Sequence, residues 1–301
     1  MPYDPSDLRT QLVNVGPATG VPREVSCREL GNSAADEVHT HGSLTWWTRS
    51  QSLVVAYTEA QPGDDLVVEG VEGESTMLVL DGAEVSVEHS SGDEVVREPA
   101  VVIVPPGPST VRVLGGGTIV RLVASCTAPT LAARCSNSDE YSEPDGNVAE
   151  FIAWPDPPAG GRVRVYRLSE HPIEEGRFGR IFRSSTVMVN VLAEDDRPRD
   201  PTKLSPHHHD DFEQVSLQIH GDYVHHLRVA WSADSTAWRD DEHRHCVAPA
   251  VVVIPPPLIH TSQAVGEMHH WLIDVFAPPR LDFSQRPGWV RNADEYPIPE
   301  S

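Results

Sequence analysis

The sequence has little positive charge. Its 301 residues carry 23 lysines and arginines against 45 aspartates and glutamates, a formal net charge of −22, and Lys203 is the only lysine. Nucleic acids and anionic membrane surfaces are bound through clustered basic residues. The charge balance therefore argues against both as partners, and an anionic substrate would have to be held by a metal or by local arginines.

Other absences narrow the class of protein further. No apolar run approaches the roughly 20 residues that span a bilayer, and residues 1–10 lack the apolar centre of a secretory signal. The cysteines are scattered without a C-x-x-C pair, which indicates neither a disulfide scaffold nor a zinc ribbon; they are Cys27, Cys126, Cys135 and Cys246. We therefore expect a cytoplasmic protein.

Long helical patterns are also scarce, and short valine-rich runs separated by Gly and Pro take their place. Many short strands at turn-marked intervals are typical of all-β sandwiches and barrels. The predicted strands are Ser52–Tyr57, Thr76–Leu80, Val85–Glu88, Val101–Val104, Thr118–Ala124, Thr186–Leu192, Val215–Ile219, Tyr223–Ala230, Val251–Ile254 and Trp271–Phe276. A short helix is expected near Val148–Ile152, within a Pro- and Gly-rich stretch.

A histidine-rich segment stands before one of these strands. In extended chain alternate side chains share a face, so His207 and His209 point to one side and His208 to the other. In the strand that follows, one face is polar and the other is apolar. The polar face consists of Gln214, Ser216, Gln218 and His220. A further ligand from a distant strand is expected at His260, which ends a valine- and proline-rich run.

These motifs resemble those of the cupin superfamily. Its first motif is His-x-His, three or four residues, an acid or amide, six residues and Gly; its second is a Pro-rich strand end followed by His. Four residues separate His209 from Gln214, and six more reach Gly221. Glu213 fits the three-residue spacing and brings a charge that an amide lacks, but it leaves Gly221 one position too far. Both alternatives stay open, with the glycine register favouring Gln214.

The chain also repeats itself. Residues 98–106 align with residues 248–256, with Pro99 on Pro249, and residues 74–82 align with residues 213–221. Together with the resemblance, this predicts two tandem cupin barrels of the double-stranded β-helix or jelly-roll type, a bicupin. The expected boundaries are 1–127 for the first barrel, 128–161 for a linker, and 162–301 for the second barrel with an irregular tail.

The alignment predicts that only the second barrel binds metal. In the first barrel His207, His209, Gln214 and His260 correspond to Val68, Gly70, Ser75 and Thr110. None of these residues holds a first-row transition metal. The first half does contain another His-x-His pair, His39 and His41, but no acid follows it at ligand distance, and we interpret it as lining or surface histidine.

The expected site is a mononuclear centre of His207, His209, Glu213 or Gln214, and His260, with open coordination positions for a chelating substrate. Fe(II) or Mn(II) is favoured, with Zn(II) or Ni(II) as alternatives. Gln218, His220 and Arg228 are the candidate catalytic residues, and Arg183 is a second candidate for gripping a substrate carboxylate through the guanidinium fork.

Three functions fit this site. We favour an O2-dependent dioxygenase acting on a small polar, anionic hydroxy- or keto-acid. The alternatives are an isomerase or lyase acting on a sugar acid, which the amide ligand and polar strand face support, and a non-catalytic binding module. A homodimer is expected, because exposed sheet edges are usually covered and cupins commonly pair.

Overall fold

The computed structural model describes residues 22–231 and 235–299. The chain forms two compact units. Unit 1 contains residues 22–34, 143–150 and 191–275, and unit 2 contains residues 35–142, 151–190 and 276–299. Both units take segments from the two halves of the sequence. The expected sequential division at 1–127, 128–161 and 162–301 stays a prediction.

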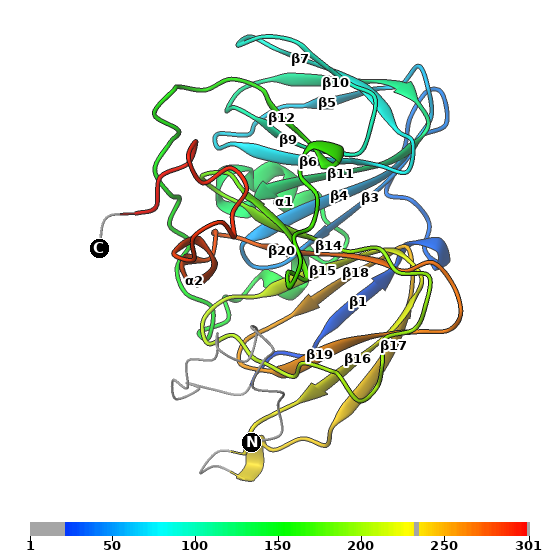
Figure 1. Ribbon diagram of the computed structural model, residues 1–301, viewed down its shortest axis with the longest axis vertical. Coiled ribbons are helices and arrows are strands. Elements are labelled where there is room, and N and C mark those ends of the chain that lie inside the picture. Colours follow the sequence, from blue (N-terminus) through cyan, green and yellow to red (C-terminus); the bar gives the residue numbers. More distant parts are fainter. Residues whose placement is uncertain (1–21, 232–234, 300–301) are drawn as a thin grey trace. The chain divides into compact units, whose positions relative to one another are not determined.

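Unit 2 contains two antiparallel sheets, seen in blue and cyan in Figure 1. One runs in the order β12-β9-β6-β11-β4-β3-β2 and the other in the order β5-β10-β7-β8. Their bounds are β2 (Glu37–Val38), β3 (Leu44–Arg49), β4 (Leu53–Ala60), β5 (Asp65–Val68), β6 (Ser75–Leu80), β7 (Glu84–His89), β8 (Glu94–Val96), β9 (Ala100–Val104), β10 (Ser109–Gly115), β11 (Gly117–Ala124) and β12 (Arg164–Arg167).

Small aliphatic side chains pack together inside unit 2. The cluster is dominated by valine and includes Leu66, Met77 and Ile119, all 2% exposed or less. Burial of this apolar surface favours the folded barrel by about 25 cal/mol per Å². The interior of unit 2 is therefore an ordinary hydrophobic core.

Unit 1 holds the other barrel. Its sheets run β1-β18-β15-β20 and β17-β16-β19, and β14 and β13 are neighbours in sheet order. The bounds are β1 (Ser26–Glu29), β13 (Gly179–Arg183), β14 (Met188–Leu192), β15 (Gln214–His220), β16 (Asp222–Arg228), β17 (Glu242–Val247), β18 (Ala250–Ile254), β19 (Ile259–Val265) and β20 (Trp271–Phe276). In contrast to unit 2, many buried residues on β15, β16 and β19 are polar.

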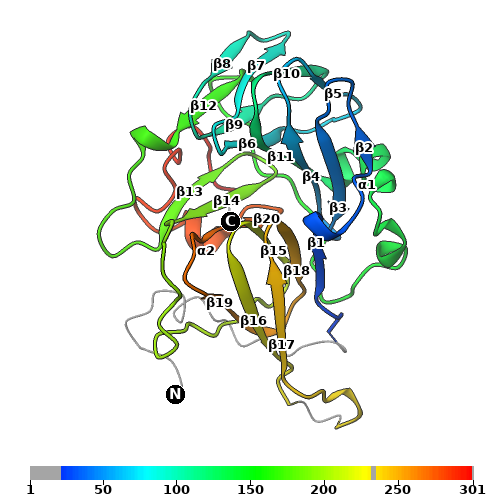
Figure 2. The same ribbon diagram turned by 90° about the vertical axis from the view of Figure 1, so that its right-hand side faces the viewer.

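The first strand of each half pairs with the other half of the sequence. Strand β1 pairs with β18, placing Cys27 opposite Val252 (Figure 2). Strand β12 pairs with β9, placing Val165 opposite Val102. Both exchanged strands end in the same way, because the N–H groups of Leu30 and Leu168 each donate to a proline carbonyl at 2.8 Å. The duplication is thus present in three dimensions, with reciprocal exchange of one strand.

Helices are few and short. They are α1 (Pro129–Arg134), α2 (Leu281–Ser284) and the 3-10 turns η2 (Leu30–Asn32), η3 (Ser125–Thr127), η4 (Ser138–Tyr141), η5 (Leu168–Glu170) and η6 (Ser235–Ala237). In the described part of the chain, none is long and apolar enough to cross a membrane.

All ten predicted strands are present, but the helix expected near Val148–Ile152 is wrong. The Asp145 carboxylate accepts the Asn147 N–H at 2.9 Å, and the Val148 N–H donates to the Asp145 carbonyl. This aspartate-centred turn competes with helix. Helix α1 forms instead, with proline at its first turn, where no N–H is needed.

A disulfide that the cysteine pattern did not indicate lies in unit 1. Cys27 on β1 bonds to Cys246 on β17 across 219 residues of sequence. Cys126 and Cys135 are free thiols. The disulfide fastens the exchanged strand β1 to the barrel that receives it.

Candidate metal centre

Three of the predicted ligands lie together in unit 1. His207 and His260 face each other across a two-residue bridge, in which the His207 N–H donates to the His260 carbonyl at 3.0 Å and the His260 N–H donates back at 2.7 Å. His209 follows two residues after His207 on the same side, while His208 faces Asp210 at 3.1 Å. The alternation expected of extended chain is therefore present.

The imidazoles are buried and held in one tautomer. His207, His209 and His260 are 9%, 4% and 2% exposed. Nδ1 of His207 donates to the Ser205 carbonyl, and Nδ1 of His260 donates to the Leu258 carbonyl, each at 2.9 Å. A neutral ring that donates through Nδ1 keeps a lone pair on Nε2. The backbone thereby directs both Nε2 atoms to the cluster as potential ligands.

Gln214 brings an oxygen to these nitrogens. Its Oε1 lies 3.0 Å from Nε2 of His209 and 3.4 Å from Nε2 of His260. The other end of the amide donates at 3.1 Å to Asp274 Oδ1 and at 3.1 Å to Ser216 Oγ, which itself donates to Asp274 at 2.7 Å. Because a carboxylate only accepts, Asp274 fixes the amide with its oxygen toward the histidines.

Glu213 does not join this arrangement. Ligand atoms of the three histidines lie within 4.8 Å of one another, and among the described residues no carboxylate completes the group. Glu213 is buried, 5% exposed, just before β15 begins. Of the two alternatives, the structure brings Gln214 to the histidines. The role of each residue in binding metal stays a prediction.

Gln218 lies on the same face of β15 as Gln214 and is fully buried. Its amide contacts Nε2 of His225 at 2.5 Å, and Nδ1 of His225 contacts Ser262 Oγ at 2.9 Å. Burial, and next to it the nearby His260, lowers the pKa of His225 to about 3. His225 is therefore a neutral hydrogen-bonding group, and it is the inward member of the pair His225 and His226.

Two candidate catalytic residues lie elsewhere. A β-bulge between Gln218 and His220 breaks the alternation of β15, and the His220 ring stacks on Trp271 at 6.3 Å between centroids. The Arg228 side chain is 63% exposed and forms an ion pair with Asp241. The expectation that both residues line the barrel interior is thus corrected, in the first case because of the bulge and in the second because Arg228 belongs to the exposed set of β16.

The remaining candidates belong to unit 2. The buried Arg183 guanidinium donates to the Tyr296 carbonyl and lies 5.1 Å from the Trp154 ring. His39 contacts Thr45, and His41 contacts Asp64. In the counterpart of the bridge between His207 and His260, Thr110 faces Val67 rather than the Val68 of the sequence alignment. Neither valine is a ligand, so the shift of one residue leaves the expectation for this barrel unchanged.

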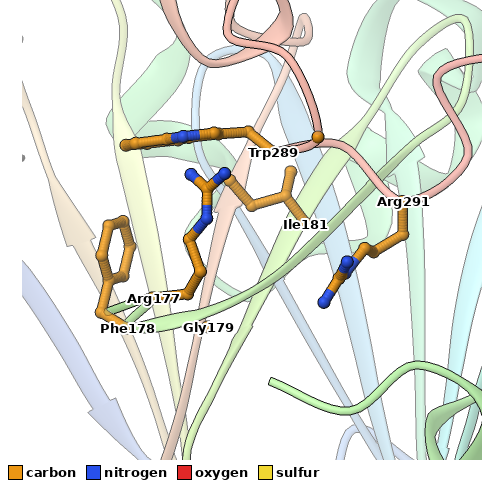
Figure 3. Close-up of a pocket in the computed structure, with 7 residues that line it drawn as sticks. Arg177, Phe178, Gly179, Ile181, Trp289 and Arg291 are labelled. Atoms are coloured by element: carbon orange, nitrogen blue, oxygen red, sulfur yellow. The ribbon is translucent and has the colours of Figure 1, made fainter. Parts of the chain in front are cut away.

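Figure 3 shows a cavity in unit 2 between Phe178, Trp289 and two arginines. The Arg177 guanidinium lies 4.7 Å from the Trp289 ring, and Arg291 pairs with Glu174 at 2.5 Å. The cavity measures about 10 Å³, which is about the space of one water molecule. It is therefore not a substrate site.

Sequence reasoning missed Asp274, which orients the proposed amide ligand. Its signal is an acid in the middle of the otherwise apolar strand Trp271–Phe276. A carboxylate in such a strand needs partners, because burial of a lone charge is costly. Gln214 and Ser216 are those partners.

The donor set fits a divalent transition metal. Neutral imidazole nitrogens and an amide oxygen are ordinary ligands for Mn, Fe, Ni and Zn. Two of the three imidazoles have their metal-facing nitrogen fixed by backbone carbonyls, and the amide has its oxygen fixed by Asp274. The cluster of three histidines in unit 1 could bind a metal.

Comparison with known proteins gives a fold and no close relative. No protein-family model matches the chain, and no curated protein matches it in sequence. Solved structures do match. Oxalate decarboxylase from Lactobacillus farciminis, as a formate complex, is 14% identical with a TM-score of 0.56, covering 89% of this chain and 88% of that one.

Bacillus subtilis oxalate decarboxylase is similarly close. A serine-to-alanine mutant of that enzyme is 14% identical with a TM-score of 0.55, covering 96% of this chain and 89% of that one. A further structure of the same enzyme is described by its Mn(II) centres. These neighbours are bicupins, and the likeness supports the cupin superfamily. The predicted all-β fold of jelly-roll barrels is confirmed.

Proposed function

We propose that the chain is a mononuclear metal-dependent cupin enzyme that acts on a small anionic hydroxy- or keto-acid, with O2-dependent dioxygenation as the favoured reaction. The observation that carries the proposal is the convergence of three buried imidazoles and the Gln214 oxygen. Buried, backbone-oriented ligands of this kind are typical of functional rather than incidental metal sites.

The charge of the ligand set favours an anionic substrate. Imidazole and amide ligands are neutral, so they leave the full charge of a divalent ion uncompensated. With four protein ligands, an octahedral ion keeps two positions for a chelating acid or for O2. When bound, such a metal polarises a carbonyl or carboxylate of the substrate and provides a place for O2 beside it.

Residues of β15, β16 and β19 supply fixed polar groups beside the ligands. His225 is neutral and held between Gln218 and Ser262. Oε1 of Gln218 is buried without a protein partner, and the contact of its Nε2 with His225 Nε2 joins two nitrogens. Rotating the amide lets its oxygen accept from His225 and leaves its N–H2 group to donate to a substrate. We propose this positioning role for Gln218.

A non-oxidative lyase is the second candidate. The structural neighbours are oxalate decarboxylases, and at 14% identity they support the fold rather than the reaction. The same metal-bound acid could lose CO2 or isomerise without net oxidation. The two candidates differ in what they consume: a dioxygenase takes up one O2 per turnover, whereas a decarboxylase releases CO2 without net O2 uptake.

The first experiment is metal analysis by inductively coupled plasma mass spectrometry on protein without a His tag. Wild type is compared with His260→Ala and with His208→Ala, whose histidine faces away from the cluster. We expect about one Mn or Fe per chain in wild type and His208→Ala and strong loss in His260→Ala. Equal metal content in all three proteins would contradict the site.

The second experiment assigns the reaction. Metal-loaded protein is incubated with a panel of small hydroxy-, keto- and dicarboxylic acids while O2 uptake and CO2 release are followed together. Stoichiometric O2 uptake supports the dioxygenase, and CO2 release without O2 uptake supports the lyase. Saturable acid binding without turnover, in protein shown to carry metal, would contradict both and leave a binding module.

A further inference from the structure

A second pair of histidines lies on the outer face of the β17-β16-β19 sheet. Along β16, Tyr223, His225 and Leu227 are buried, so the intervening His226 belongs to the opposite face. Strand β17 places His243 directly opposite His226. This face is separate from the one that carries His260 and His225.

The two rings meet through nitrogen atoms. Nδ1 of His226 lies 2.7 Å from Nδ1 of His243. Nε2 of His226 donates to the Gln263 oxygen at 2.9 Å, which leaves Nδ1 of the neutral ring as a lone-pair acceptor. One proton on His243 therefore occupies the space between two imidazole nitrogens. A cation that replaces this proton gains both nitrogens as ligands.

The spacing indicates which cations fit. With metal–nitrogen bonds of about 2.0–2.1 Å, neighbouring ligands lie roughly 2.9 Å apart at a right angle and roughly 3.4 Å apart in a tetrahedron. The observed 2.7 Å is near the right-angle value. Square-planar and tetragonal geometries with nitrogen and oxygen ligands are those of Cu(II) and Ni(II).

The surroundings leave room for the rest of a coordination shell. Both imidazoles line a cavity of about 450 Å³, together with Gln263, Asp241 and the apolar residues Leu204 and Ile259. Asp241 lies two residues before His243 in the sequence and holds Arg228 through its carboxylate. Water or a small ligand can reach the open positions from this cavity, and the net charge of −22 attracts cations.

We propose that His226 and His243 form a second metal site on the outer face of this sheet, which binds one Cu(II)- or Ni(II)-type ion through the two Nδ1 atoms. Gln263 is a positioning residue that fixes the tautomer of His226. The site is independent of the function proposed for the His207 cluster.

The test uses Cu(II), the full-length chain without a His tag, equilibrium dialysis and electron paramagnetic resonance. His226→Gln and His243→Gln are compared with wild type and with His245→Gln. His245 is the matched control, because it is the next exposed histidine on β17 and lies opposite Val224 rather than another histidine. Circular dichroism verifies that these surface variants fold.

We expect wild type and His245→Gln to bind two Cu(II) ions per chain. His226→Gln and His243→Gln should bind one, with affinity for the other weakened about tenfold or more. In a His207→Ala/His260→Ala background, the remaining Cu(II) signal should show two nitrogen ligands. Unchanged Cu(II) binding in His226→Gln and His243→Gln, or equal weakening in all three variants, would overturn the proposal. If the double-alanine background does not fold, the stoichiometries in the otherwise wild-type chain decide.

Discussion

Replacement of Gln214 by glutamate should destabilise the metal-free protein, even though glutamate is the stronger metal ligand. The amide now donates to Asp274 Oδ1 at 3.1 Å. In Gln214→Glu, a carboxylate oxygen takes the place of that N–H2 group, so two acceptors face each other. The contact that orients the ligand becomes a repulsion between like charges.

The size of the effect follows from this distance. Two unit charges 3.1 Å apart repel by about 5 kcal/mol at an effective dielectric constant of about 20, and loss of the hydrogen bond adds about 1 kcal/mol. Rotation of the Ser216 hydroxyl and separation of the side chains relieve part of this. We expect a loss of about 2–4 kcal/mol in the free energy of unfolding.

A double-mutant cycle isolates the contact. Asp274→Asn alone should be nearly neutral, because the asparagine oxygen can still accept from Gln214 and Ser216. In Gln214→Glu/Asp274→Asn the donor and acceptor are exchanged, and most of the lost stability should return. The assay is urea unfolding of chelator-treated protein. The reasoning is refuted if Gln214→Glu is as stable as wild type, or if Asp274→Asn does not rescue it.

Three further predictions concern single positions. Glu213→Gln should keep full metal content by plasma mass spectrometry; loss of metal would return the ligand role to Glu213. Gly221→Ala should lower stability by about 1–3 kcal/mol in urea unfolding, because φ is +83° and the new Cβ would lie 2.4 Å from a histidine ring atom; an unchanged midpoint would contradict this. Burial alone raises the pKa of Asp64, but hydrogen bonds, first those from Ser43, outweigh it and lower the pKa to about 2. The stability that ionised Asp64 contributes is thus present above about pH 4 and lost as pH falls toward 2. The stability difference between wild type and Asp64→Asn should shrink over that range in pH-dependent unfolding, and a constant difference would refute the assignment.

The sequence was most informative where a local pattern decides the structure. Alternation placed His207 and His209 on one side, and valine-rich runs located ten strands. Spacing to Gly221 favoured Gln214 over Glu213, and the structure brings Gln214 to the histidines. The same logic failed at His220, because one bulged residue reverses every side chain that follows.

Long-range pairing was not readable from the sequence. Nothing local in Ser26–Glu29 indicates that its partner lies more than 200 residues away. The link from Cys27 to Cys246 and the contact between Gln214 and Asp274 depend on that same distant pairing of strands. Arg228 was misplaced for a related reason, since its partner Asp241 comes from a segment further along the chain, just before the neighbouring strand.

The exchanged strands have a consequence for biosynthesis. Strand β1 leaves the ribosome first, yet its partner β18 is among the last strands to be made. Until then β18 has no neighbour on that side, and an open sheet edge invites pairing between chains. Either half of the gene expressed alone would meet the same hazard permanently, so the two copies, once duplicated, became obligate companions in a single polypeptide.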